Sequence, residues 1–234
     1  MIASPAPLLR ATGVAKTFTL HLQGGTRLAV LHDVSLELRA GECVALAGVS
    51  GSGKSTFMRA LYGNYGIDAG SIVVRDGDRD VDLTGLEPHE LTALRARTVG
   101  YVSQFLRVIP RIPALEIATE PLVATGVEAA LARTIVSALF TRLALPQRLW
   151  QLSPTTFSGG EKQRVNLART LAVAYPVLLL DEPTSALDAD SRERVIGLLL
   201  ERKKAGVAMV GIFHDDEVRR RLADRCVSFG LKPE

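Results

Sequence analysis

This chain of 234 residues has few cysteines and few aromatic residues, and its net charge is small. Its two cysteines, Cys43 and Cys226, are far apart and neither belongs to a CxxC pair, which argues against a disulfide framework or a metal–thiolate site and fits a reducing compartment. Lys and Arg number 28 against 25 Asp and Glu, and a net charge of +3 is too small to indicate nucleic-acid binding. The one dense basic run, Arg219–Arg221, is expected on a solvated helix face. We therefore expect no nucleic-acid partner.

Long apolar runs are scarce as well. The first ten residues do not show a basic segment followed by an apolar one, so we expect no signal peptide. The region Pro121–Phe140 is rich in apolar residues but contains Glu128 and Arg133. No segment approaches the ~20 apolar residues that a membrane-spanning helix needs. We expect a cytoplasmic protein that does not span a membrane by itself.

Short apolar strands alternate with helices in the second half of the chain, as in a parallel sheet covered on both faces. The alternating segment Leu28–Leu38 instead indicates a half-buried strand near the N-terminus. The sequence predicts an α/β fold with a mostly parallel core sheet, an N-terminal antiparallel β part and a helical subdomain inserted at about residues 105–172. We expect a single domain over residues 1–234. Further strands are predicted at 43–47, 71–75, 80–83, 99–103, 177–180 and 207–213, and helices at 55–62, 116–145 (with a break at Gly126), 159–174, 188–204 and 217–223.

The segment Gly48–Ser55 reads GVSGSGKS and matches the phosphate-binding pattern GxxxxGK[ST] at every fixed position. It follows an apolar strand and precedes a predicted helix, which is the context that this motif requires and which argues against an ordinary glycine-rich turn. Backbone N–H groups and the helix N-terminus would face the phosphates of ATP. Lys54 is expected to contact the β- and γ-phosphates and Ser55 to bind Mg²⁺. The predicted ATP-binding residues of this loop are Gly48, Ser50, Gly51, Ser52, Gly53, Lys54, Ser55 and Thr56.

Two carboxylates, Asp181 and Glu182, follow the predicted strand 177–180. The C-terminal ends of strands are where open α/β sheets bind their ligands. We expect Asp181 to hold Mg²⁺ and Glu182 to act as the general base that polarises the attacking water. An acidic strand end that caps the next turn is the alternative for this pair taken alone.

The segment Phe157–Glu161, with Lys162, Gln163 and Arg164 after it, resembles the signature motif of ATP-binding-cassette (ABC) ATPases, and further motifs of that family follow in the family's order. They are the Q-loop glutamine Gln104, the D-loop aspartate Asp188, the switch histidine His214 and the adenine-stacking aromatic Phe18. The motif begins with Phe157 and ends with Glu161, where the commonest form has Leu and Gln. The negative charge of Glu161 near a phosphate-facing helix is expected to slow turnover or to suit a specialised partner.

The resemblance implies that two such domains form a head-to-tail dimer, either with a second copy or with a sister ATPase, and enclose two ATP molecules. The γ-phosphate bound by one domain would be contacted by Ser158, Gly159 and Gly160 of the other. Gln104 would contact Mg²⁺, and His214 would bind the γ-phosphate and help to orient water. The residues then predicted to be catalytic are Lys54, Gln104, Glu182 and His214.

Three stretches, 101–111 (YVSQFLRVIPR), 148–150 (RLW) and 211–215 (GIFHD), resemble the L-type ATPase subunits of the bacterial carbon–phosphorus lyase system. This resemblance implies a phosphonate-degrading assembly that joins a phosphonate to a ribose triphosphate from ATP, with the lyase core complex as partner. The segment after Gln104 contains Phe105, Leu106, Arg107, Arg111 and two prolines, and we expect it to be an exposed docking face.

Two other functions remain open. The chain could be the ATPase of a lipoprotein or macrolide exporter, whose strand-rich N-terminal segment resembles residues 19–31, or of a phosphonate importer. It could also be a nucleotide-dependent scaffold that does not hydrolyse ATP. The presence of both Glu182 and His214 argues against the scaffold.

Overall fold

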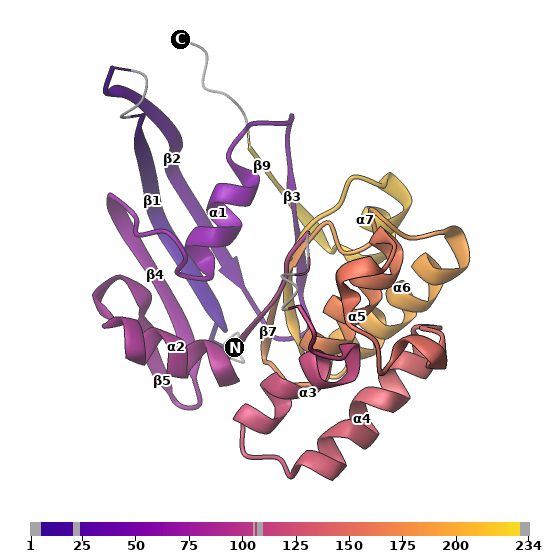
Figure 1. Ribbon diagram of the computed structural model, residues 1–234. Coiled ribbons are helices and arrows are strands. Elements are labelled where there is room, and N and C mark those ends of the chain that lie inside the picture. Colours follow the sequence, from indigo (N-terminus) through magenta and orange to yellow (C-terminus); the bar gives the residue numbers. More distant parts are fainter. Residues whose placement is uncertain (1–5, 21–23, 105, 107–109, 230–234) are drawn as a thin grey trace, which may run out of the picture.

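The computed structural model describes residues 6–20, 24–104, 106 and 110–229, which form two sheets with helices between and around them (Figure 1). The antiparallel sheet has the order β2-β1-β4-β5 and contains β1 (Leu9–Leu20), β2 (Thr26–Leu38), β4 (Ala69–Asp76) and β5 (Arg79–Asp82). The core sheet has the order β6-β7-β8-β3-β9 and contains β6 (Val99–Val102), β7 (Val177–Asp181), β8 (Ala208–Ile212), β3 (Cys43–Ala47) and β9 (Arg225–Ser228). All four neighbouring pairs of the core sheet are parallel, which confirms the predicted fold class.

Helices cover both faces of the core sheet. The α-helices are α1 (Lys54–Leu61), α2 (Pro88–Arg97), α3 (Ala114–Ala124), α4 (Ala129–Arg142), α5 (Gly159–Leu171), α6 (Ala189–Lys204) and α7 (Asp216–Leu222), with short 3₁₀ turns at Leu83–Gly85, Gln147–Leu149 and Pro154–Thr156. Helix α1 lies between the two sheets, and α5, α6 and α7 lie on the other face of the core sheet (Figure 1).

The strand β7 shows why its sequence is an unbroken apolar run. Val177 and Leu179 pack in the apolar cluster on the α1 face, whereas Leu178 and Leu180 pack in the cluster on the α5 face. Every residue of the strand is buried. Because successive side chains point to opposite faces, a strand that is covered on both sides needs an apolar residue at each position.

The helical segment is divided as the sequence predicts. Gly126 separates α3 from α4 with a φ of 94°, and Glu128 caps α4 by accepting hydrogen bonds from the N–H groups of Ala130 and Leu131. Helices α3 and α4 pack against α5 and share its apolar cluster. Within the described ranges, no helix combines the length and the apolar character that are needed to cross a bilayer.

Helix α2 was not predicted from the sequence. Only Leu94 is buried on it, so the helix has no apolar stripe to reveal its period. Its start is nevertheless marked by Pro88 in the first turn and by a reciprocal cap between Glu87 and Glu90. These local signals could have identified its N-terminus.

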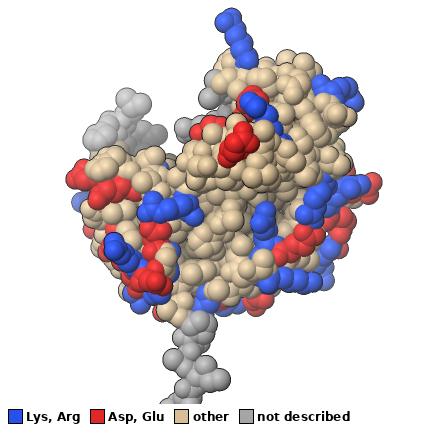
Figure 2. Space-filling view, turned by 90° about the horizontal axis from the view of Figure 1, so that it is seen from below, with Lys and Arg blue, Asp and Glu red and all other residues tan. Residues whose placement is uncertain are grey.

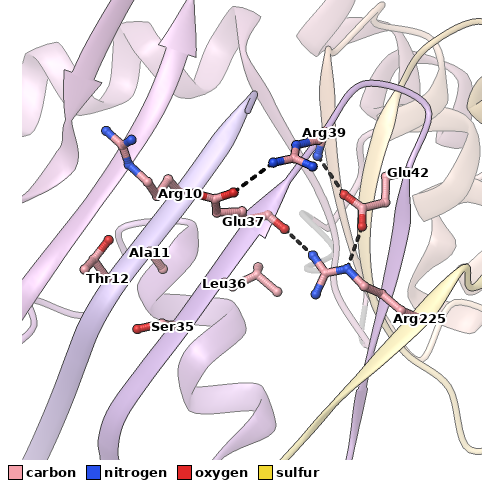
Figure 3. A pocket seen from close by; sticks show the side chains of 9 residues that line it. All are labelled: Arg10, Ala11, Thr12, Ser35, Leu36, Glu37, Arg39, Glu42 and Arg225. Atoms are coloured by element: carbon pink, nitrogen blue, oxygen red, sulfur yellow. Dashed lines mark hydrogen bonds and ion pairs between the residues drawn. The ribbon is translucent and has the colours of Figure 1, made fainter. Parts of the chain in front are cut away.

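An ionic cluster joins the two sheets at the N-terminal ends of β3 and β9 (Figure 3). Arg225 Nε donates to Glu42 Oε1 at 2.6 Å, and its Nη2 donates to the Glu37 carbonyl oxygen. Arg39 contacts the side chains of both acids. The surrounding pocket of about 530 Å³ is lined by Arg10, Ala11, Thr12, Ser35, Leu36, Glu37, Arg39, Glu42 and Arg225. This pocket lies at the opposite end of β3 from the phosphate loop, and its acids already pair with two of its three arginines.

We predict that Arg225→Ala lowers the free energy of unfolding by about 1 kcal/mol, because it removes an ion pair and a hydrogen bond between the sheets. Arg10→Ala is the matched control, since Arg10 lies in the same pocket and forms no ion pair within the described part of the chain. Urea denaturation of both variants measures the difference. Equal destabilisation by the two changes would contradict a role for the Arg225 contacts.

Candidate nucleotide-binding site

The phosphate loop leaves β3 at Ala47 and enters α1 at Lys54. Gly48 has a φ of 147° and Gly53 a φ of 94°, in the region that L side chains rarely adopt. A Cβ on Gly48 would lie 2.2 Å from the carbonyl oxygen of Phe229, and a Cβ on Gly53 would lie 2.8 Å from that of Val30. Both positions therefore require glycine for the loop to keep this shape.

Positive charge gathers on this loop from two sources. Lys54 is buried, and its Nζ donates hydrogen bonds of 2.7 Å to the carbonyl oxygens of Gly48 and Val49 and one of 3.4 Å to Ser52 Oγ. The N-cap residue Gly53 has no side chain that could cap α1. The N–H groups of the first turn are consequently available to an anion, which the helix dipole also favours.

A pocket of about 420 Å³ opens over the loop, a volume within the usual range for small-molecule sites. It is lined by Phe18, Leu28, Val30, Ser50, Gly51, Gly53, Lys54, Ser55, Thr56, Glu182, Ile212 and His214. Most of these are predicted site residues. Gly48 and Ser52 do not line the pocket but reach it through their contacts with Lys54.

One wall of the pocket is apolar. Phe18 and Leu28 are register partners in the β1–β2 pair, and Leu28 is 51% exposed. The Phe18 ring packs edge-on against Tyr65 with the ring centroids 5.4 Å apart. A half-buried aromatic ring and an exposed leucine beside a phosphate loop can stack a base.

Asp181 ends β7 at the same edge of the sheet and is only 5% exposed. Its Oδ2 accepts a hydrogen bond of 2.9 Å from the hydroxyl of Tyr101. Burial raises the pKa of Asp181 above its ordinary value, although the Tyr101 hydrogen bond acts in the opposite direction. Burial also raises the pKa of Tyr101, so that this hydroxyl stays a donor. A cation next to Asp181 would offset the cost of burying its charge.

Glu182 leaves the strand through an unusual backbone conformation. Its φ is 53°, and its N–H donates to the Ile212 carbonyl oxygen at 3.1 Å. A left-handed conformation costs a residue with a side chain about 1–3 kcal/mol and is found most often at functional sites. It breaks the side-chain alternation of β7 directly after Asp181.

The Glu182 carboxylate joins two other predicted catalytic residues. Its Oε2 accepts a hydrogen bond of 2.9 Å from Gln104 Nε2, and its Oε1 lies 2.6 Å from His214 Nε2. The Glu182 side chain is 16% exposed, whereas that of His214 is 64% exposed. The structure thus brings together side chains that follow β6, β7 and β8, in a position to hold and polarise a water molecule.

Besides Gly48 and Ser52, four predicted ATP contacts do not line this pocket: Ser158, Gly159, Gly160 and Asp188. Ser158 is the N-cap of α5 and Asp188 the N-cap of α6. The two loops pack together, since a Cβ on Gly160 would lie 2.8 Å from the Ala186 carbonyl oxygen. They form a second surface rather than a wall of the pocket.

Glu161 also has a structural role at the start of α5. Its Oε2 accepts hydrogen bonds from Ser158 N at 2.8 Å and from Ser158 Oγ at 2.9 Å, and its own N–H donates to Ser158 Oγ at 3.3 Å. This capping box stabilises the start of α5, and its hydrogen bonds lower the pKa of Glu161. The pattern Ser-x-x-Glu is visible in the sequence and could have been identified there.

The expected docking face after Gln104 needs a correction. Leu106 is 9% exposed and belongs to the apolar cluster of α3 and α5, so it cannot offer an exposed contact. Phe105 and Arg107 lie outside the described residues. Pro110 and Arg111 are exposed, and Pro113 is half-buried as the N-cap of α3.

Charged side chains of both signs are interspersed on the face shown in Figure 2. Two arginines of the basic run on α7 also pair with acidic side chains. Arg219 Nη2 lies 2.9 Å from Asp216 Oδ1, and Arg221 Nη1 lies 2.5 Å from Glu193 Oε1. This agrees with the expected solvated helix face.

A glycine-rich loop between a parallel strand and a helix, with a pair of carboxylates at the end of another strand of the same sheet, defines a P-loop nucleotide-binding protein. The family model described as ABC transporter matches residues 31–185. The lipoprotein-releasing system ATP-binding protein LolD of Maricaulis maris is 41% identical over 204 residues, which cover 86% of each chain. The chain belongs to the ABC transporter family and is an ABC-type ATPase.

Two further similar proteins are a longer ATP-binding/permease protein and a cassette with a dimeric structure. The macrolide export ATP-binding/permease protein MacB of Brucella melitensis is 40% identical over 95% of this chain, but this chain spans only 33% of that protein. The ATP-binding cassette MJ0796, in a dimeric structure with ADP and Pi, has a TM-score of 0.86 and 29% identity, and the match covers 94% of each chain.

We predict that Lys54→Ala weakens ATP binding about 10–100-fold, because it removes charge-assisted hydrogen bonds to the phosphates. Lys204→Ala removes the same charge from the exposed last turn of α6 and is the control. Equilibrium binding of a fluorescent ATP analogue measures both. An unchanged affinity in the Lys54 variant would contradict the assignment of the phosphate loop.

Proposed function

We propose that this chain binds and hydrolyses Mg-ATP as the nucleotide-binding subunit of a MacB- or LolD-type membrane transporter. The observation that supports hydrolysis is the contact of Glu182 with both Gln104 and His214 at the edge of the phosphate-loop pocket. The similarity to LolD, over nearly the full length of both chains, supports the transporter. A separate permease would supply the membrane-spanning part, and the ATPase would work at its cytoplasmic side.

The residues near the loop fit Mg²⁺. Ser55, Asp181 and Gln104 offer a hydroxyl, a carboxylate and an amide oxygen, and Mg²⁺ prefers oxygen ligands. No cluster of three or more His, Cys, Asp or Glu that could hold a metal occurs among the described residues. This suits a cation that is bound by one carboxylate and by the phosphates of its nucleotide. When bound, Mg²⁺ would neutralise charge on the β- and γ-phosphates.

The side chains of this chain have separate tasks in the proposed reaction. Lys54 and the first turn of α1 bind the phosphates, and the backbone of the loop fixes their position. Glu182 accepts the proton of the attacking water. Gln104 and His214 hold the two oxygens of Glu182, so that its carboxylate keeps one orientation.

We further propose that a second cassette completes the site. Ser158, Gly159, Gly160 and Asp188 lie on a surface apart from the pocket of their own chain. A head-to-tail arrangement would direct the N-terminus of α5 at the γ-phosphate of the partner, where its N–H groups and dipole stabilise negative charge. The dimeric assembly described for MJ0796 supports such a pair, which can be two copies of this chain or this chain with a sister ATPase.

We predict that Glu182→Gln reduces ATP hydrolysis about 10²–10⁴-fold with little change in ATP affinity, because the amide keeps the shape of the side chain but cannot accept a proton. Phosphate release and nucleotide binding are measured on the same preparation. Glu193→Gln, on the exposed face of α6, is the control. Hydrolysis at the normal rate in the Glu182 variant would exclude Glu182 as the base.

A second function remains a candidate on the strength of three stretches, 101–111, 148–150 and 211–215, which resemble the ATPase subunit of the carbon–phosphorus lyase system. Under that reading the partner is a phosphonate-processing complex instead of a permease. The catalytic cycle at the pocket would be the same in both.

Affinity purification of the Glu182→Gln variant with Mg-ATP separates the two functions. Cells are grown with a phosphonate as the sole phosphorus source, and the retained proteins are identified by mass spectrometry. We expect permease subunits to be recovered from the detergent-solubilised membrane fraction. Recovery of carbon–phosphorus lyase subunits without a permease would contradict the transporter and support the second function.

A further inference from the structure

Tyr101 lies one strand away from the proposed metal-binding carboxylate. It sits in β6 opposite Leu179 of β7, and both pack in the apolar cluster on the α1 face. Since alternate residues of a strand share a face, Asp181 points to the same side as Leu179 and therefore to the side of Tyr101. This register places the tyrosine hydroxyl within 2.9 Å of Asp181 Oδ2.

The Tyr101 side chain is held on two further sides. Its ring packs against that of Tyr62 at the end of α1, with the centroids 5.1 Å apart. The guanidinium of Arg59, also on α1, lies close enough to lower the pKa of Tyr101 against the effect of burial. The Tyr101 hydroxyl is the donor to Asp181, since an ionised carboxylate can only accept hydrogen bonds.

Arg59 also contacts Tyr65, which lies beside the Phe18 wall of the nucleotide pocket. Its Nη1 donates to the Tyr65 hydroxyl at 2.9 Å, and its guanidinium lies 5.8 Å from the centroid of the Tyr65 ring. Tyr65 in turn packs edge-on against Phe18. The helix that begins with the phosphate loop therefore carries one arginine between the apolar wall and the carboxylate.

We propose that Tyr101 is a positioning residue for Mg²⁺, which fixes the Asp181 carboxylate through its hydroxyl so that the carboxylate faces the phosphate loop. The inference rests on the nucleotide site proposed above. The hydrogen bond occupies Oδ2, restricts rotation of the carboxylate and supplies one of the polar contacts that a buried charge needs. Without it, the carboxylate would have to be oriented by the metal itself.

The variant Tyr101→Phe removes only the hydroxyl oxygen and keeps the ring. We expect its affinity for a fluorescent ATP analogue in EDTA to equal that of the original chain. The Mg²⁺ concentration that gives half of the metal-dependent increase in affinity should rise about 10-fold, as is common when a group that orients a metal ligand is lost. Mg²⁺ titration of analogue binding measures this without any need for hydrolysis.

The matched control is Tyr62→Phe, which removes a hydroxyl from the adjoining ring and leaves the Tyr101–Asp181 contact in place. We expect it to leave the Mg²⁺ dependence unchanged, with thermal unfolding of both variants checked in parallel. An unchanged half-saturating Mg²⁺ concentration in the Tyr101 variant would overturn the proposal. An equal loss of affinity with and without Mg²⁺ would also overturn it, because Tyr101 would then support only the fold. If the original chain bound no analogue in either condition, the proposed nucleotide site itself would be wrong.

Discussion

The parallel pairing of β6, β7, β8 and β3 is the constraint on which the site depends. Because these strands run in one direction, their C-terminal ends meet at a single edge of the core sheet. Gln104, Glu182, His214 and the phosphate loop each follow one of these ends. Backbone hydrogen bonds between these strands thus bring together residues that are far apart in the chain. The phosphate loop and His214, for example, are separated by more than 150 positions. A slip of one strand by one residue would turn its side chains to the other face and separate the group.

Local strain at this edge is balanced by the packing around it. Gly48 and Gly53 adopt left-handed conformations at no steric cost, so the phosphate loop is shaped by the choice of residue. Glu182 adopts such a conformation despite its side chain, and its backbone N–H is held by Ile212 while its carboxylate is held by Gln104 and His214. The contacts on both the backbone and the side chain compensate for an unfavourable φ, which is why it can persist at this position.

The elements that can be predicted from the sequence are those that depend on local residue patterns. The apolar strands and the glycine-rich loop were predicted because burial on two faces and tight turns restrict the residue type at each position. Helix α2 was missed because its single buried residue, Leu94, leaves no periodic pattern. The burial of Leu106 was missed because a short loop pattern does not reveal which cluster covers it. The hydroxyl of Tyr101 could not be linked to Asp181, since that contact depends on the register between two strands 75 residues apart in sequence.

The capping box of α5 has a consequence for the proposed head-to-tail dimer. Ser158 Oγ has one proton, which it donates to Glu161 in the structure. A γ-phosphate from a partner site would compete for that proton, and the backbone N–H groups of Gly159 and Gly160 would be the main donors to the anion, because the Glu161 N–H already donates to Ser158 Oγ. The Glu161 carboxylate, charged because the same hydrogen bonds lower its pKa, would also repel the phosphate. Closure of the proposed dimer would therefore exchange a favourable cap within one chain for a contact between chains. A glutamine at this position could keep the cap through its amide oxygen without adding the charge, so in the proposed dimer Glu161 would weaken the closed state relative to the open one.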